Sequence, residues 1–231
     1  MNTIWVFARA RPVATLSMVT LFSIVMVALL ADVVATHDPL AQNVTQRLSP
    51  PGPNHYFGTD GFGRDVFSRV VHGARVSLFV ALLAVSMAAV AGISIGMSSA
   101  YHGGKLDLLI QRVVDVLLGF PFLVLVLIIV VAIGPSWISV AGAIALGLAP
   151  QIARLSRAAA LSVKAETYVE AARVIGASPY RIIWKHMLRN SFPVILAQVT
   201  GYFGVAIVAE TTLSFLGLGV PPPFPSWGRM L

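Results

Sequence analysis

Long apolar runs, separated by short polar segments, dominate the pattern of this chain. Five mainly apolar stretches predict membrane-spanning helices, at 12–31, 76–104, 108–133, 138–150 and 190–209. A helix needs roughly 20 apolar residues to cross a hydrocarbon core of about 30 Å. The charge-free run 116–153 is too long for one helix, and Gly134-Pro135-Ser136 divides it into a hairpin. The pattern therefore predicts an all-α, polytopic helical membrane protein with five spans.

The first apolar run follows Arg9 and Arg11, as the core of a secretory signal would. The apolar core of a signal peptide spans about 7–15 residues. Because the run 12–31 is longer, we expect a retained membrane anchor rather than a cleaved signal.

Two residue pairs inside the expected spans bear on helix packing. Gly92 and Gly96 form a small-xxx-small pair, which can let two helix backbones approach closely in lipid. The same two glycines are equally well explained by the abundance of glycine in membrane helices. Arg112 and Asp115 stand at i and i+3, so we expect an ion pair on one helix face rather than a proton relay.

The positive charge of the chain is concentrated in one segment. The whole chain has 16 Lys and Arg against 9 Asp and Glu, and residues 151–189 supply seven of the basic residues and two of the acidic ones. Short loops rich in Lys and Arg stay on the cytoplasmic side. With the N-terminus placed inside by Arg9 and Arg11, five spans put 36–75, 134–137 and 211–231 outside, and 100–110 and 151–189 inside.

The composition excludes several classes of protein. Only 11% of the residues are charged and 57% are hydrophobic, whereas soluble domains carry about 25% charged residues. The absence of cysteine excludes disulfides and thiolate metal sites. The five histidines have no His-x-x-x-His spacing, so we expect no resident metal, although a metal ion could be cargo. The chain has no P-loop, since its one Gly-Lys pair is followed by Leu106, and no catalytic motif, so we predict no enzyme and no bound cofactor.

The segment 168–188 has the pattern of two short helices joined by a tight turn. A helical stretch from Tyr168 meets Gly176, then Ser178-Pro179, and resumes as far as Leu188. Glycine suits the end of a helix, and proline is favoured in the first turn of the next one. Such a turn could project from the membrane and offer a knob to a partner.

The spacing of Glu170, Ala171, Ala172 and Gly176 resembles the EAA motif of ABC importer permeases. In that family the motif forms a coupling helix that docks into a groove of the ATP-hydrolysing subunit. The resemblance implies a coupling role for Glu170, Ala171, Ala172, Arg173 and Gly176. The family motif continues to a proline where this chain has Arg189, which puts the start of the second helix in doubt.

Two further segments resemble the dipeptide/oligopeptide/nickel branch of these permeases, in the subunit with the shorter outer loop (C-type). Residues 57–78 resemble its GTD-x-x-GRDV-x-SR…G-x-R-x-SL signature, and residues 210–231 resemble its LSFLGLG…P-x-WG-x-ML stretch. The resemblance covers about residues 13–231 and implies the ABC type I importer permease fold. It assigns an outer-loop or gate role to Asp60, Arg64, Asp65, Glu210, Gly217 and Gly219.

The resemblance also implies a domain organisation and a set of roles for those residues. Residues 1–75 would form an anchor helix and an outer loop, and 76–231 a permease core with the coupling loop 151–189. Asp60, Arg64, Asp65 and Arg69 are expected to pair with one another and to pack the pore mouth, rather than to touch substrate. Gly217 and Gly219 would form a re-entrant element near the outer gate. Glu210 is expected at the outer end of the fifth span, and a role in lining the cavity is the alternative left open. The family usually has a sixth span after the WG-x-ML stretch, whereas this sequence ends at Leu231.

The function implied is a permease subunit of an ATP-driven importer in the bacterial inner membrane. Its partners would be a homologous permease, two ATP-binding subunits that carry ATP and Mg²⁺, an external substrate-binding protein and the lipid bilayer, with no nucleic acid. The cargo, whether a dipeptide, a longer peptide, a nickel chelate or another small solute, is left open. A secondary transporter or channel, for which only Asp115 and Glu210 lie near the spans, and a scaffold whose basic loop binds anionic lipid are the alternatives.

Overall fold

The computed structural model describes residues 9–231, which divide into two compact units. The first unit extends to Phe79 and includes Pro222–Leu231, and the second is Val80–Pro221. Helices dominate both units, and within the described residues the β-structure is limited to one bridge between Thr59 and Asp65. The predicted all-α class is confirmed. The domain boundary expected at residue 75 stays a prediction.

The first unit contains one long apolar helix and a folded loop, which is the segment 35–65 between α3 and α4. Its elements are α2 (Pro12–Leu29), α3 (Ala31–Val34), η1 (Val44–Gln46), the start of α4 (Val66–His102) and η3 (Trp227–Arg229). Pro12 stands in the first turn of α2, where its missing N–H removes no helical hydrogen bond. At 18 residues and with almost all of its surface exposed, α2 is long and apolar enough to cross a membrane, as the first run predicts.

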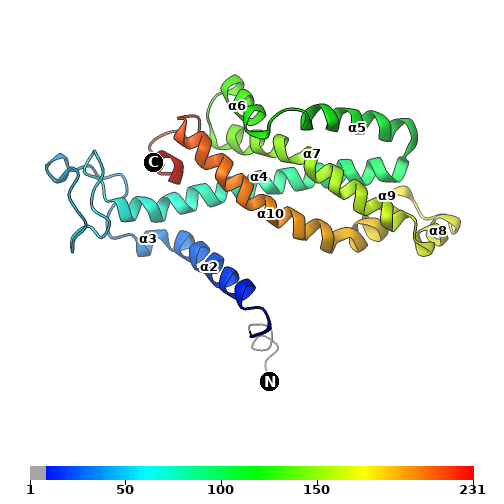
Figure 1. The fold of residues 1–231 in the computed structure, drawn as a ribbon, viewed down its shortest axis with the longest axis horizontal. Coiled ribbons are helices and arrows are strands. Elements are labelled where there is room, and N and C mark those ends of the chain that lie inside the picture. The colour runs from blue at the N-terminus through cyan, green and yellow to red at the C-terminus, as the bar shows by residue number, and fades with distance from the viewer. Residues whose placement is uncertain (1–8) are drawn as a thin grey trace. The chain divides into compact units, whose positions relative to one another are not determined.

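The second unit is a bundle organised around α7. After α4 come α5 (Gly104–Leu118), α6 (Phe122–Ile133), α7 (Trp137–Lys164), α8 (Thr167–Val174), α9 (Pro179–Arg181), the π-helical turn η2 (Ile182–Met187) and α10 (Leu188–Phe215) (Figure 1). Helix α7 packs against α5, α6 and α10. In the apolar 18-residue stretch of α7 that could span a membrane, 61% is buried inside the protein. Helix α7 is therefore the central helix of the bundle.

Two glycines let α4 lie against α7. A Cβ atom on Gly92 would stand 2.7 Å from the carbonyl oxygen of Ala149, and one on Gly96 would stand 2.8 Å from the backbone nitrogen of Arg157. Real Cβ atoms do not approach so closely, so the backbones touch only because both side chains are absent. The small-xxx-small interpretation is confirmed, and the view that these glycines are incidental is wrong at both positions.

The third expected span, 108–133, is not one helix. Helices α5 and α6 meet at an angle of 89° across the break Gly119-Phe120-Pro121. Proline lacks the N–H that would continue the helix, and it disfavours helical geometry at the residue before it. Among the described residues four helices are long and apolar enough to cross a membrane, or five if this bent pair is one span.

Three element boundaries also differ from the prediction. Helix α7 passes through Pro150 and continues to Lys164, so the fourth span is longer than 138–150 and the first part of the basic segment is helix. Spanning helices tolerate proline because neighbouring groups satisfy the freed carbonyl. Helix α4 already begins at Val66, ten residues before the start of the second span expected at 76–104. The fifth helix, α10, extends beyond residue 209 to Phe215.

Candidate functional site

The turn between α8 and α9, here called the α8–α9 turn (Thr167–Arg181), has a closed local hydrogen-bond pattern. Gly176 has a φ of 81°, a left-handed conformation that glycine adopts without steric cost. The N–H of Ala177 donates to the carbonyl of Ala172 at 3.0 Å, which satisfies the end of α8. Ser178 caps the next helix and Pro179 opens it. The predicted tight turn and the short helix before it are confirmed. The prediction of a second short helix is wrong, because α9, η2 and α10 follow one another without a break as one helix, Pro179–Phe215.

The α8–α9 turn presents an apolar tip beside two charges. Val169 faces inward and is buried, whereas Glu170 and Arg173 on the same helix are exposed. Val174 and Ile175 follow at the tip, each more than four-fifths exposed. An exposed apolar patch with a polar rim is typical of a protein-docking surface. The turn could therefore fill an apolar groove while its charges contact the rim.

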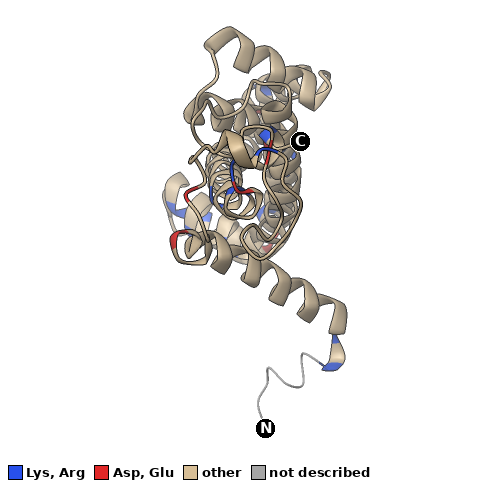
Figure 2. Ribbon diagram, turned by 90° about the vertical axis from the view of Figure 1, so that its left-hand side faces the viewer, with Lys and Arg blue, Asp and Glu red and all other residues tan. Residues whose placement is uncertain are grey.

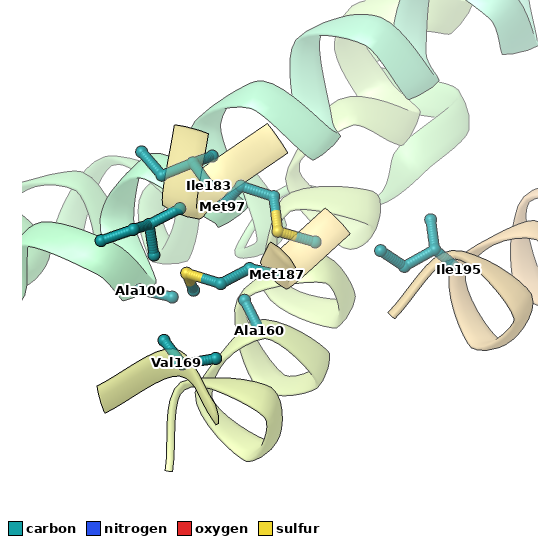
Figure 3. Packing of buried hydrophobic residues seen from close by; sticks show 8 residues of the cluster. Met97, Ala100, Ala160, Val169, Ile183, Met187 and Ile195 are labelled. Atoms are coloured by element: carbon teal, nitrogen blue, oxygen red, sulfur yellow. The ribbon is translucent and has the colours of Figure 1, made fainter. Parts of the chain in front are cut away.

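A buried apolar cluster lies beneath the α8–α9 turn and connects it to the spanning helices (Figure 3). It draws side chains from α4, α7, α8, η2 and α10, and comprises Met97, Ala100, Ala160, Val169, Ile182, Ile183, Met187 and Ile195. Protein interiors are close-packed, so a displacement of α8 must be accommodated by its neighbours. This connection was not predicted, because contacts among five separate segments leave no pattern in one sequence.

Polar contacts hold the C-terminal end of α4 against the end of α7 and against α8. The ammonium group of Lys164, in the last turn of α7, donates to the carbonyls of Ala100 and Tyr101 at 2.7 and 2.8 Å. Cations are favourable at helix C-termini, where carbonyls lack helical partners. The guanidinium of Arg173 in α8 lies 5.8 Å from the centre of the Tyr101 ring. The end of α4 is thus held by both α7 and α8.

The ion pair expected between Arg112 and Asp115 is wrong. Asp115 of α5 pairs with Arg154 of α7, and Arg112 is exposed without being that partner. A second pair joins the same two helices, between Asp107 and Arg157. Because α5 packs along α7, the long arginine side chains of α7 reach the carboxylates across the helix contact. The prediction considered only partners on the same helix, and it therefore missed Arg154 on α7.

Asp60 of the folded loop pairs with two of the charges predicted to surround it, Arg64 of the same loop and Arg69 at the start of α4. Asp60 accepts the Nε hydrogen of Arg64 at 2.7 Å and lies 3.5 Å from Nε of Arg69. Burial on its own would raise the pKa of Asp60, but the N–H groups of Arg64 and Phe62 and the Arg64 guanidinium bring that pKa below its usual 3.8, since they favour the charged form. The mutual pairing predicted for Asp60, Arg64 and Arg69 is confirmed.

Asp65 departs from that prediction, because its ion-pair partners are histidines. Its Oδ1 lies 2.9 Å from Nδ1 of His55 and 3.9 Å from Nδ1 of His37. Its Oδ2 accepts the N–H of Ser68 at 2.8 Å and so caps the start of α4. The preference of aspartate for the position before a helix explains why this carboxylate faces inward, away from the arginines.

The C-terminal segment packs on the first turns of α4, within the first unit. The indole N–H of Trp227 donates to the carbonyl of Val70 at 3.1 Å. A Cβ atom on Gly73 would stand 3.0 Å from Met230 and 3.2 Å from Trp227, so glycine leaves room for both side chains. The motif at 210–231 therefore contacts the motif at 57–78, which neither motif indicated by itself.

Glu210 lies inside α10, not at the end of a span. The helix continues to Phe215, and the Glu210 side chain is fully buried. Ser214 donates to its Oε1 at 2.6 Å, while Oε2 has no hydrogen-bond partner among the described residues. Gly217 has a φ of 78°, and a Cβ on Gly219 would collide with Ser214. The expected gate roles of these residues stay predictions.

Charged residues are sparse along the helices (Figure 2). The described sites thus comprise a docking-type turn, a charged loop and a buried carboxylate, joined to long apolar helices. Residues 92–231 match the family described as binding-protein-dependent transport system inner membrane component. The chain belongs to this family. Residues 3–51 match a second family, the N-terminal TM domain of oligopeptide transport permease C.

Relatives in two bacteria carry names of the same kind. The dipeptide transport system permease protein of Alkalihalophilus pseudofirmus is 39% identical over 223 residues, which are 96% of this chain and 73% of that protein. The dipeptide transport system permease protein of Bacillus subtilis is 36% identical over 226 residues, or 98% of this chain and 71% of that protein. The resemblance drawn from the three motifs is confirmed.

A solved structure shares the fold. A crystal structure described as an amino acid ABC transporter with histidines superposes with a TM-score of 0.51 at 20% identity, over 71% of this chain and 74% of that chain. At this identity the likeness concerns the fold alone. The expected ABC permease fold is confirmed, and the protein is an inner membrane component of a transport system.

Proposed function

We propose that this protein is a permease subunit of an ATP-binding-cassette importer for dipeptides or oligopeptides. The observation that carries the proposal is the exposed α8–α9 turn, anchored in the core of a bundle of apolar helices. The names of the two relatives support peptides as the cargo. In this assignment the chain forms one half of a translocation pore and contains no ATP-binding site of its own.

The proposed assembly contains a homologous permease, two ATP-binding subunits and an external substrate-binding protein. The basic content of residues 151–189 supports a cytoplasmic position for the α8–α9 turn, with the N-terminus on the same side. The ATP-binding subunits would then meet the chain at that turn. The binding protein would approach from the opposite side of the membrane.

Docking of the α8–α9 turn would couple ATP hydrolysis to the pore. Val174 and Ile175 would enter an apolar groove of the ATP-binding subunit, and Glu170 and Arg173 would contact its rim. When that subunit moves, α8 moves with it. Through the cluster around Met187, the motion passes to α4, α7 and α10, because close-packed side chains transmit displacement rather than absorb it. The pore would then open alternately to each side.

Substitutions in the turn test this proposal in the assembled transporter. Replacement of a central apolar interface residue by a charge costs about 2 kcal/mol or more of binding, which is about 30-fold in affinity. We expect Ile175→Asp to release the ATP-binding subunits during purification and to lower peptide uptake by at least about tenfold. Glu170→Gln should lower uptake less and uncouple ATP hydrolysis from the substrate.

Two controls separate docking from folding. Asp38→Asn removes an exposed carboxylate of the first unit and should leave uptake and co-purification unchanged. A methyl group in Gly176→Ala meets no atom within 4 Å. Its effect should therefore be limited to the backbone strain at a positive φ, which is about 1–2 kcal/mol. Normal uptake by both Glu170→Gln and Ile175→Asp, with the chain inserted in the membrane, contradicts the coupling role. Uptake that continues without ATP contradicts the importer assignment itself.

A further inference from the structure

Three potential metal ligands from separate segments of the first unit converge on one point. They are His37 after α3, His55 in the folded loop and Asp65 at the start of α4. Their ligand atoms all lie within 4.8 Å of one another. The two imidazole rings are 4.6 Å apart between centres, and both present Nδ1 to the same carboxylate oxygen of Asp65.

The charge balance at this point favours a cation. Asp65 is buried, and among the described residues its ion-pair partners are the two imidazoles, with no lysine or arginine. A buried carboxylate in its charged form is costly unless a positive charge lies beside it.

The two oxygens of Asp65 have different surroundings. Oδ2 accepts the N–H of Ser68 and caps α4, with the hydroxyl of Thr36 at 3.4 Å. Oδ1 faces the two imidazoles. Helix capping therefore accounts for one oxygen only, and the other is left to face two groups that are good metal ligands in their neutral form.

Neighbouring side chains hold the ligands in the required orientation. Nδ1 of His55 lies 2.9 Å from Oδ1 of Asp65, and Nε2 lies 3.2 Å from Oε1 of Gln46. Metal binding would release the Nδ1 proton, which frees the Nδ1 lone pair for the ion while Nε2 donates to Gln46. Metal-binding histidines commonly donate their second ring N–H to an oxygen in this way. The backbone N–H of His37 donates to the hydroxyl of Ser68 at 3.0 Å, which fixes that residue beside α4.

The cluster is also accessible from one side. The side chain of Asp65 is 1% exposed and that of His55 is 12% exposed, whereas that of His37 is 42% exposed. Two ligands are thus held within the loop, and the third lies at its surface. Such a site leaves an entry path for an ion.

We propose that His37, His55 and Asp65 bind one divalent transition-metal ion of the zinc class. Two imidazoles and one carboxylate suit Zn²⁺ and its neighbours, whereas Mg²⁺ and Ca²⁺ prefer sites made of oxygen ligands. The ion joins the segment after α3 and the folded loop to the start of α4. It stabilises the folded loop, since a ligand that binds only the folded state shifts the equilibrium toward it.

Metal binding to the full chain in detergent tests the site. The chain is stripped with a chelator, dialysed against ZnCl₂ at neutral pH and analysed for bound zinc. We expect one zinc ion per chain, with nitrogen and oxygen ligands at about 2.0–2.2 Å by X-ray absorption. His37→Gln and His55→Gln should each lower the affinity by at least about tenfold. His102→Gln, an exposed histidine whose Nδ1 faces the Ser98 carbonyl of its own helix, is the matched control and should bind as the wild type does.

Two variants keep the test decisive if the histidine variants do not fold. Asp65→Asn retains an oxygen that can cap α4 but removes the charge, so the helix content should persist while zinc binding is lost. Gln46→Ala removes the partner of His55 and should lower the affinity by about 10- to 100-fold. Absence of zinc from the wild type, or equal binding by Asp65→Asn, overturns the proposal. Neither result bears on the peptide-import function, which is measured by uptake.

Discussion

Arg157 of α7 holds the carboxylate of Asp107 in α5 through two of its nitrogens, at 2.7 Å for Nε and 2.5 Å for Nη2. The hydroxyl of Ser99 in α4 also donates to this carboxylate, so three helices meet at one anion. Charged bidentate pairs of this kind are the stronger hydrogen bonds of proteins. The pair therefore fixes α4, α5 and α7 to one another.

We predict that Arg157→Ala lowers the free energy of unfolding by about 2 kcal/mol, because it leaves a largely buried carboxylate without its partner. The matched control is Arg154→Ala, which removes the other pair between the same helices. The Arg154 and Asp115 side chains are 55% and 50% exposed. Removal of that exposed pair should cost about 0–1 kcal/mol. Thermal unfolding of both variants in one detergent measures the difference. Equal losses for the two arginines contradict the ranking.

The contact between α4 and α7 gives a second prediction. A methyl group on Gly96 would stand 2.8 Å from the Arg157 nitrogen and closer still to the Ala153 carbonyl, both of which are backbone atoms. Gly96→Ala should therefore force the helices apart and cost about 1–3 kcal/mol. In Gly142→Ala of α7 the methyl group meets no atom within 4 Å. That variant should be neutral or stabilising by up to about 1 kcal/mol. A neutral Gly96→Ala in the same unfolding assay would show that the helices are not in backbone contact.

The pH dependence of stability should reflect Asp60. Its pKa in the folded chain lies below the usual value of 3.8, so the unfolded chain binds more protons as the pH falls through that range. The stabilising contribution is therefore complete above the usual pKa and is lost as the pH falls through the folded pKa. At pH 7 we expect Asp60→Asn to be less stable than the wild type by about 1–2 kcal/mol. Unfolding measured from pH 7 down to pH 3 should show the difference shrink, and a constant difference contradicts this account.

Replacement of the buried carboxylate of Glu210 in α10, unlike the destabilising substitutions above, is expected to keep or raise the stability of the chain. Because Oε2 of Glu210 has no hydrogen-bond partner among the described residues, a neutral amide should fit the isolated chain at least as well as the charge does. We expect Glu210→Gln to keep or raise the melting temperature. Ser214→Ala, which removes the donor to Oε1, should lower it. If Glu210→Gln also abolishes uptake, the carboxylate is retained for transport rather than for stability. A lower melting temperature for Glu210→Gln contradicts the prediction.

The sequence predicts the helices of this fold better than their contacts. The apolar runs locate α2, α4, α7 and α10 because a spanning helix needs a length of apolar chain that few other structures require. The bend between α5 and α6 was missed, although Gly119 and Pro121 could have indicated it. The fourth span was expected to end at Pro150, whereas α7 continues through this proline to Lys164.

The local parts of the site were predictable and the long-range parts were not. The turn at Gly176 follows from residue preferences within a few positions, and it was predicted correctly. The approach of His37 to His55 and Asp65 depends on how the loop folds back on α4, and the spacing of histidines along the chain gave no sign of it. The exchange of Arg112 for Arg154 as the partner of Asp115 has the same origin. Helices can be predicted from one sequence because they depend on the local pattern of residues. Ion pairs cannot, because they depend on which side chains the tertiary fold brings close together.

The hydrogen bond from Trp227 to Val70 joins residues that are 157 positions apart. Because ribosomes add about 5–20 residues per second, the segment around Trp227 follows Val70 by about 8–30 s. Throughout that interval the start of α4 is made but its indole partner is not. The packing around Gly73 must therefore follow the synthesis of the intervening helices α5 to α10. A nascent chain arrested before Trp227 should accordingly leave this face of α4 open to whichever insertase or chaperone attends it.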